Sequence, residues 1–204
     1  MSGRGRLLVF EGIDGSGKTT QVRRVATAMD ALATFEPGDT PLGKALRAVV
    51  LDPSVTMSPL AELMVMAADR AQHVAEVIEP ALASGRDVVC DRFSGSTLAY
   101  QGYGRGLDVG ELRRLSDWAM VGGWPDLAVL IDVPAEVAWA RLHAAGRRAD
   151  RLEAEGTGFH TRVRDGYRVL AAESPGCWVV VDGDGPEDVV ASRVRAAVTR
   201  RIPE

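Results

Sequence analysis

Residues 12–19 read G-I-D-G-S-G-K-T, which matches the phosphate-binding loop pattern G-x-x-x-x-G-K-[ST] in full. The loop follows the apolar run Leu7–Phe10 and precedes the helix-compatible stretch Thr20–Leu32. Its glycines let backbone N–H groups face an anion, its lysine adds a charge at the terminal phosphates, and its threonine hydroxyl can ligate Mg²⁺. We therefore predict a strand, loop and helix that bind a nucleoside triphosphate through Gly12, Ile13, Asp14, Gly15, Ser16, Gly17, Lys18, Thr19 and Thr20.

Short apolar runs alternate with longer helical patterns along the chain. The runs are Leu7–Phe10, Ala33–Phe35, Asp87–Cys90, Ala128–Ile131 and Trp178–Val181. Strands buried on both faces have this composition, and their alternation with helices is typical of βαβ units. The further helical candidates are Leu42–Val50, Pro59–Ala83, Val109–Val121, Ala135–Ala144, Gly158–Ala172 and Pro186–Arg200. We predict a single domain over residues 1–204, a three-layer α/β/α fold with a five-stranded parallel sheet and its ligand at the carboxyl ends of the strands.

The composition restricts the class of protein. Hydrophobic residues make up 46% and charged residues 25% of the chain, as in soluble globular proteins. The net charge of −4 gives no global electrostatic reason to bind nucleic acid or membranes. No apolar run is long enough to span a membrane, and no signal-type segment opens the chain. Cys90 and Cys177 form no disulfide framework or metal motif, so we expect a reduced, cytoplasmic protein.

A second informative stretch, C-D-R-F-S-G-S-T-L-A-Y-Q-G-Y-G-R-G-L, covers Cys90–Leu107 and begins where a predicted strand ends. Asp91 and Arg92 should therefore project into the crevice, where a carboxylate suits a Mg²⁺ shell and a guanidinium matches a phosphate bidentately. A surface ion pair that caps the strand is the alternative. The following side chains Thr97, Tyr100 and Gln101 have spacings suited to one pocket wall, although each alone also fits a turn or packing role.

An arginine-rich segment, R-L-H-A-A-G-R-R-A-D-R-L-E-A-E, covers Arg141–Glu155 and breaks between two helical patterns. Arg147, Arg148 and Arg151 fall within five positions of one another. Taken alone, such a charge run is usually a solvated face. The phosphate loop itself contains no arginine, so further positive charge for a polyphosphate has to come from elsewhere in the chain.

Together these motifs resemble the thymidylate kinases, which move the γ-phosphate of ATP to dTMP. The matching blocks are F-E-G-I-D-G-S-G-K-T-T-Q at 10–21, E-P-G-D-T-P-L-G at 36–43, A-A-D-R-A-Q-H-V at 67–74, D-R-F-S-G-S-T-L-A-Y-Q-G at 91–102 and D-R-L-E at 150–153. Five ordered blocks across nearly the whole chain are far more specific than a lone phosphate loop. The resemblance implies a nucleoside monophosphate kinase fold, ATP and Mg²⁺, the products dTDP and ADP, and a homodimer.

The resemblance also implies roles in acceptor binding. Asp14 would contact the sugar 3′-hydroxyl and Arg92 the 5′-phosphate, while Arg70 would reach the thymine edge. The complete expected acceptor set is Asp14, Glu36, Pro37, Met66, Arg70, Arg92, Thr97, Tyr100 and Gln101, with Tyr100 crowding the 2′ position. Read without the family, Asp14 also fits a solvent-facing loop carboxylate, and Arg70 fits an exposed helical ion pair with Asp69.

The arginine-rich segment resembles the lid of the bacterial enzymes, here at about residues 145–156. Such a lid closes arginines over the transferring phosphoryl group when the loop carries none. The expected catalytic residues are Lys18, Arg92, Arg147, Arg148 and Arg151. Arg151, within D-R-L-E, matches the family lid most closely, but spacing does not decide among the three lid arginines. Arg141 would stack on adenine, and Thr19 and Asp91 would hold Mg²⁺.

Two departures from the family pattern concern the base. Met66 occupies the position of the usual phenylalanine, and Phe35 a position that is often arginine in bacterial members. Methionine lies against an aromatic face but fixes ring geometry less tightly. A paralogue that acts on a different or modified nucleoside monophosphate therefore stays open, as does an inactive kinase-like nucleotide-binding protein.

Two other nucleotide-binding classes can be weighed from the residues. A GTPase would need the guanine-reading motif N-K-x-D, which the chain lacks because its only lysines are Lys18 and Lys44. A deoxynucleoside kinase would need a carboxylate base such as Glu11 or Glu36, but an arginine placed for an acceptor phosphate favours a monophosphate. Apolar residues within Leu60–Val77 and Leu112–Trp118 fit either a dimer interface or the core.

Overall fold

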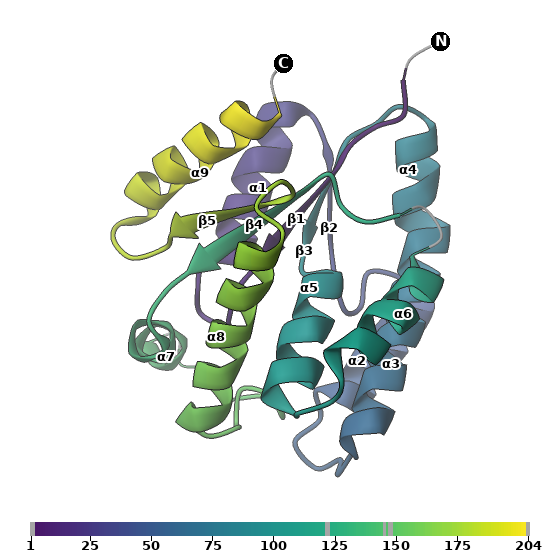
Figure 1. Ribbon diagram of the computed structural model, residues 1–204, viewed down its shortest axis with the longest axis vertical. Helices are drawn as coiled ribbons and strands as arrows, with labels where there is room; N and C mark the ends of the chain where they lie inside the picture. The colour runs from purple at the N-terminus through teal and green to yellow at the C-terminus, as the bar shows by residue number, and fades with distance from the viewer. Residues whose placement is uncertain (1–2, 121–122, 145, 147–148, 203–204) are drawn as a thin grey trace.

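The computed structural model describes residues 3–120, 123–144, 146 and 149–202. A parallel sheet with the strand order β2-β3-β1-β4-β5 forms its centre (Figure 1). Its strands are β1 (Leu7–Glu11), β2 (Leu32–Phe35), β3 (Val88–Asp91), β4 (Leu127–Asp132) and β5 (Trp178–Asp182). The strands β1, β2, β4 and β5 each contain a predicted apolar run in full, and β3 contains the run Asp87–Cys90 except for Asp87. Because β1 lies between β3 and β4, the loops that leave β1 and β3 meet at the carboxyl edge of the sheet.

Helices cover both faces of the sheet, which confirms the three-layer prediction (Figure 1). They are α1 (Lys18–Met29), α2 (Pro41–Val50), α3 (Pro59–His73), α4 (Glu79–Ala83), α5 (Ser94–Thr97), α6 (Val109–Ala119), α7 (Ala135–Ala144), α8 (Thr157–Glu173) and α9 (Glu187–Arg201). Two π-helical segments, η1 (Val74–Ile78) and η2 (Leu98–Gly104), continue α3 and α5. Among the described residues, no helix has the length and apolar character needed to cross a membrane.

Two helical predictions need correction, and one helical run was missed. The first helix ends at Met29 rather than Leu32, because Asp30 adopts a left-handed backbone conformation and Leu32 already starts β2. The helix expected over Pro59–Ala83 is continuous but contains the π-helical segment η1, which ends just before Pro80, a residue without an N–H for the helical ladder. The helical run through α5 and η2 was not predicted, because the glycines of S-G-S-T-L-A-Y-Q-G-Y-G obscure helical periodicity.

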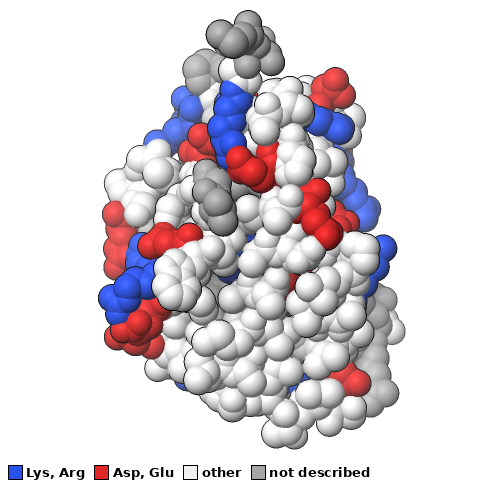
Figure 2. All heavy atoms as spheres, turned by 90° about the vertical axis from the view of Figure 1, so that its right-hand side faces the viewer, with Lys and Arg blue, Asp and Glu red and all other residues white. Residues whose placement is uncertain are grey.

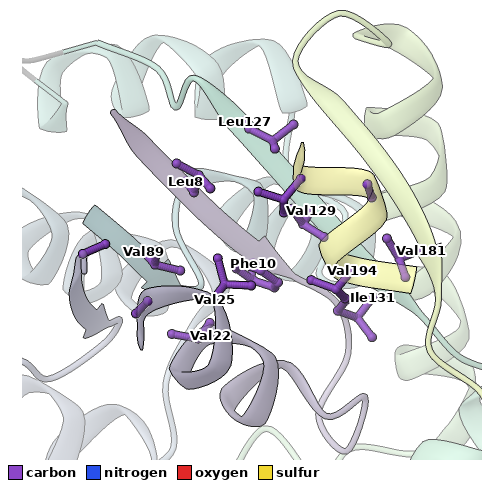
Figure 3. Packing of buried hydrophobic residues seen from close by; sticks show 14 of the residues in the cluster. Leu8, Phe10, Val22, Val25, Val89, Leu127, Val129, Ile131, Val181 and Val194 are labelled. Carbon is purple, nitrogen blue, oxygen red and sulfur yellow. The ribbon is translucent and has the colours of Figure 1, made fainter. Parts of the chain in front are cut away.

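The core fixes β1 from both sides. On one face, Leu8 and Phe10 pack with side chains of α1 and α9, including Val25 and Val194 (Figure 3). On the other face, Leu7 and Val9 pack against residues of η1 and α4. All five residues of β1 are buried. This packing gives the phosphate loop, which begins directly after β1, a rigid base.

Candidate active site

The phosphate loop joins β1 to α1 and depends on glycines in the left-handed region. Gly15 has a φ of 79°, and a Cβ there would lie 2.3 Å from the Ala138 carbonyl oxygen of α7. Lys18 is 5% exposed, and its Nζ donates to the Ile13 carbonyl at 2.9 Å. Burial, together with the charge of Arg92, lowers the pKa of Lys18 to about 8. The lysine is therefore held inside the loop that is predicted to bind a triphosphate.

Arg92 extends from the end of β3 towards the phosphate loop. Its Nη2 donates to Asp14 Oδ1 at 2.6 Å, and its Nη1 donates to the Gly12 carbonyl at 3.0 Å. Tyr100 completes the group, because its hydroxyl donates to Asp14 Oδ2 at 2.8 Å. Burial opposes ionisation of Asp14, but the charges of Arg92 and Lys18 outweigh it and hold the pKa of this carboxyl below its ordinary value.

These contacts decide between the open interpretations of Asp14 and of the Asp91-Arg92 dipeptide. Asp14 turns towards Arg92 and Tyr100 rather than into solvent. Asp91 and Arg92 do not form a capping ion pair: Asp91 Oδ2 accepts a hydrogen bond of 2.5 Å from Thr19 Oγ1, whereas Arg92 binds Asp14. Both side chains of the D-R dipeptide thus face the crevice from the carboxyl end of β3.

A buried polar group centred on Glu11, which the sequence suggested only as a possible base of a deoxynucleoside kinase, lies behind Arg92. Glu11, at the end of β1, is fully buried and accepts hydrogen bonds from the Ser96 hydroxyl at 2.7 Å and the Tyr167 hydroxyl at 3.0 Å. The same two hydroxyls accept from Arg92 Nη1 at 3.1 and 3.2 Å. Burial raises the pKa of Glu11. Only the position of Glu11 beside the glycine loop hinted at this role, since its partners come from distant parts of the chain.

A cavity beside Arg92 is lined by every residue of the predicted acceptor set. The side chains come from the segments after β1, β2 and β3, from α2, α3, α5 and η2, and from the segment between α7 and α8. We call it the acceptor pocket. It is lined by Asp14, Glu36, Pro37, Arg47, Leu51, Met66, Asp69, Arg70, Arg92, Ser96, Thr97, Tyr100, Gln101, Asp150 and Leu152.

Arg70 is fixed at the base of the acceptor pocket. It is 3% exposed, and its Nε donates to Glu36 Oε2 at 2.9 Å while its Nη1 donates to Thr97 Oγ1 at 2.9 Å. Its Nη2 donates to the Phe93 carbonyl at 3.0 Å. The alternative of an exposed helical ion pair with Asp69 is therefore wrong. A buried guanidinium held on three sides keeps one orientation towards the pocket.

Glu36 and Asp69 form a buried acidic pair under the same pocket. Glu36 Oε1 lies 3.0 Å from His73 Nδ1, and Asp69 Oδ1 accepts from the Gly38 backbone N–H at 3.0 Å. Burial and the nearby charge of Glu36 raise the pKa of Asp69 to about 6. Asp69 and His73 are thus parts of the site's support that the sequence analysis did not include.

A larger, more open cleft adjoins the acceptor pocket over the phosphate loop. We call it the donor cleft. Asp14, Glu36, Arg47 and Arg92 line both cavities, so the two share a wall. Arg47 of α2 was missed by sequence reasoning because nothing in the sequence marks it; its Nη1 donates to the Pro37 carbonyl at 2.6 Å. The cleft is lined by Asp14, Gly15, Gly17, Lys18, Thr19, Thr20, Val22, Arg23, Ala33, Thr34, Phe35, Glu36, Arg47, Asp91, Arg92, Arg141 and Leu142.

Arg141, which was predicted to stack on adenine, and Arg151, which was predicted to act from the lid, lie in different surroundings. Arg147 and Arg148 lie outside the described residues. Arg141 of α7 lines the donor cleft, and its Nη2 donates to the Gly183 carbonyl at 3.1 Å. Arg151 lines neither cavity; instead its Nη1 lies 2.7 Å from Glu62 Oε2 of α3.

Comparison with known proteins identifies the family. A family model described as thymidylate kinase matches residues 10–194. The chain belongs to the thymidylate kinase family. The resemblance inferred from the five sequence blocks is confirmed. As a member of this family, the chain is an enzyme.

Individual relatives match along almost the whole length. The thymidylate kinase of Synechococcus sp. strain JA-2-3B'a(2-13) is 49% identical, over 96% of this chain and 95% of that protein. The thymidylate kinase of Trichlorobacter lovleyi is 46% identical, over 96% of this chain and 97% of that protein. Among solved structures, thymidylate kinase from Ehrlichia chaffeensis has a TM-score of 0.77 and 30% identity, over 96% of this chain and 99% of that one.

Proposed function

We propose that this protein transfers the γ-phosphate of ATP to dTMP, giving dTDP and ADP, with the triphosphate in the donor cleft and dTMP in the acceptor pocket. The observation that carries the assignment is the shared wall of the two cavities, where Asp14 and Arg92 face both. A donor phosphate on the glycine loop and an acceptor phosphate on Arg92 would then lie next to each other. Alignment of this kind is the main requirement of phosphoryl transfer.

Charge neutralisation supplies the rest of the mechanism. The attacking group is a phosphate oxygen of dTMP, which is ionised at neutral pH and needs no strong general base. This fits the carboxylates present: Glu11 accepts four hydrogen bonds, from the backbone N–H groups of Phe93 and Ser96 and the hydroxyls of Ser96 and Tyr167, and Glu36 is engaged by Arg70 and His73. Lys18 and Arg92 would stabilise the charge that develops on the transferring group.

Recognition of the acceptor follows from the pocket walls. Arg70 and Thr97, held against each other at 2.9 Å, would face the thymine edge, and Met66 would lie on its ring. Asp14 would accept a hydrogen bond from the sugar 3′-hydroxyl, while Tyr100, fixed by Asp14, would crowd the 2′ position. Pro37 would sit against the sugar, and Gln101 would complete the wall of η2.

Magnesium fits the residues beside the loop. Thr19 Oγ1 and Asp91 Oδ2 are hard oxygen ligands that already lie 2.5 Å apart at the edge of the donor cleft. Among the described residues, no group of three or more His, Cys, Asp or Glu side chains could hold a metal ion, which suits an ion bound largely through substrate phosphates and water. When bound, the ion would neutralise charge on the β- and γ-phosphates.

We also propose the homodimer that the family resemblance implies. Exposed apolar side chains collect on α3 and α6, where Leu60 is 56%, Met64 50% and Trp118 85% exposed. Figure 2 views the side of the molecule on which α4, α3 and α6 lie, and its lower half carries few charged side chains. Exposed apolar side chains on a face with few charges favour association.

A panel of acceptors tests the proposed activity. Formation of ADP from ATP and Mg²⁺ is measured with dTMP, dUMP, dCMP, dGMP or UMP at matched concentration. We expect the fastest turnover with dTMP. Preference for another monophosphate would overturn the base assignment but keep the kinase class, whereas ADP formation that no acceptor stimulates would overturn the transfer itself.

A further inference from the structure

Arg151, the arginine of D-R-L-E, is directed at a buried carboxylate. Glu62, in the first turn of α3, is 0% exposed and receives three side chains. Gln101 Nε2 donates to it at 2.8 Å, Arg105 Nη2 donates at 3.0 Å, and Arg151 Nη1 lies 2.7 Å away. Burial opposes the charge of Glu62, but the hydrogen bonds from Arg105, Gln101 and Arg151 hold its pKa below the ordinary value. Glu62 is thus a buried, charged carboxylate to which three side chains bind.

Two further contacts fasten Arg151 to the end of α2. Its backbone N–H donates to the Leu51 carbonyl at 3.0 Å, and its Nε donates to the Val50 carbonyl at 2.8 Å. The side chain is 11% exposed. Arg151 therefore connects its own segment to α2 and, through Glu62, to α3 and η2.

The residues on either side of Arg151 are part of the acceptor pocket. Asp150 and Leu152 both line it, as does Leu51, whose carbonyl receives the Arg151 N–H. A second contact holds the far end of the segment: Arg105 Nη1 donates to Glu155 Oε1 at 2.5 Å. The segment Asp150–Glu155 thus forms a wall of the pocket and is attached to the rest of the domain through the arginines bound to Glu62.

We propose that Arg151 is a positioning residue for the acceptor site: by binding Glu62 and the end of α2, it holds Asp150 and Leu152 against the dTMP pocket, rather than contacting the transferring phosphoryl group. The inference rests on the proposed function, since the pocket's ligand is dTMP. It differs from the catalytic role that family resemblance gives to this arginine. It also explains why a residue of an arginine-rich segment is almost buried.

Binding of dTMP without ATP separates the two roles. A residue that touches only the transferring phosphoryl group has no effect on binding of dTMP alone, whereas a residue that builds the pocket wall does. We expect Arg151→Ala to weaken dTMP binding in calorimetry by roughly tenfold or more, the size of coupling typical of contacting residues. ATP affinity should change less than about twofold, because Arg151 does not line the donor cleft. Unchanged dTMP affinity would overturn the proposal.

A double-mutant cycle tests whether Arg151 acts through Glu62. If it does, the KM for dTMP of the double variant Arg151→Ala, Glu62→Gln should be no higher than that of whichever single variant has the higher KM. Independent, multiplying effects would contradict the proposal. A ~10³-fold loss of kcat in Arg151→Ala with an unchanged KM for dTMP would also contradict the proposal, because a loss of that size is typical of an arginine that contacts the phosphoryl group.

Two further variants guard against an unfolding artefact. Arg151→Lys keeps a charge facing Glu62 but loses the fork that also reaches the Val50 carbonyl, so its KM for dTMP should fall between wild type and Arg151→Ala. If Arg151→Ala does not fold, this variant decides the question by the same split between dTMP and ATP affinity. Arg113→Ala breaks an exposed ion pair between α6 and α8 and should leave both affinities unchanged.

Failure of this inference is distinguishable from failure of the proposed function. Wild-type protein that binds no dTMP would overturn the proposed function itself. Wild-type protein that binds dTMP as expected, with an Arg151→Ala variant of equal affinity, would overturn the role of Arg151 alone.

Discussion

Arg92 Nη2 and Asp14 Oδ1 form an ion pair of 2.6 Å at the wall shared by the acceptor pocket and the donor cleft. An acceptor phosphate that binds Arg92 must therefore share the guanidinium with a carboxylate. The Nη1 and Nη2 groups of Arg92 already donate to five protein acceptors, so a bound phosphate would share these N–H groups or displace one of their partners. Both carboxylate oxygens of Asp14 already accept a hydrogen bond, so the sugar contact proposed above would use a second lone pair of one of them.

Removal of the Arg92 side chain should nearly abolish turnover. Arg92 has a φ of 71°, a conformation that is strained in Ala but free in Gly, so Arg92→Gly is the better test of the side chain. We expect Arg92→Ala and Arg92→Gly to lose about 10³-fold or more in kcat in an ADP-release assay, as when other phosphoryl-transfer arginines are lost. Arg92→Lys keeps the charge without the fork and should also be strongly impaired. Turnover within tenfold of wild type in the Gly variant would show that Arg92 has been assigned the wrong role.

Binding of ATP should take up a proton at alkaline pH. The pKa of Lys18 is lowered to about 8 in the nucleotide-free protein, so near pH 8.5 much of it is neutral, and phosphates at its Nζ favour the charged form. ATP affinity should therefore fall as the pH rises through 8, with uptake of up to about one proton on binding. Calorimetry in buffers of different ionisation enthalpy measures this uptake.

The two lysines of the chain provide a matched control for that experiment. Lys18→Arg should abolish the proton uptake, because a guanidinium does not titrate in this range. Lys44→Arg, on the surface of α2, should leave it unchanged. Equal uptake in the Lys18→Arg variant and the wild type would assign the proton to another group.

The loop and the sheet were predictable because their signals are local. The phosphate-binding pattern spans eight positions, and each strand is marked by its own short apolar run. The acceptor pocket was predicted only through the family resemblance, since its contacts join distant segments: Asp14 and Arg92 are 78 residues apart. Sequence spacing shows which residues are candidates for a site, but it does not show which carboxylate meets which arginine.

Residues to which no motif assigns a role were missed for the same reason. Glu11 is an acidic residue beside the glycine loop, and only the fold shows that it is buried and bound by Ser96 and Tyr167. Arg151 illustrates the converse case, because a residue within a charged and apparently solvated run is almost buried against Glu62. Buried polar partners depend on tertiary packing, which local patterns do not encode.

Asp69 should make the protein less stable as the pH rises from about 4 to 6. Its folded-state pKa is raised to about 6, so within this window the native state holds a proton that the unfolded state has released. Asp69→Asn should remove this contribution. Between pH 4 and pH 7, the unfolding free energy of the variant should therefore rise relative to that of wild type by on the order of 2 kcal/mol. Urea denaturation at several pH values measures the difference. An equal pH dependence in both proteins would mean that Asp69 ionises normally in the native state.

Two loop glycines should differ in how well they tolerate a methyl group. Gly15 and Gly17 have φ values of 79° and 90°, so alanine at either position costs roughly 1 to 2 kcal/mol of backbone strain. At Gly15 the added Cβ would also lie 2.3 Å from the Ala138 carbonyl oxygen, whereas at Gly17 it would meet no atom within 4 Å. Urea denaturation without nucleotide should therefore show a clearly larger loss of stability for Gly15→Ala. Equal losses would mean that α7 moves away at little cost and does not hold the loop in place.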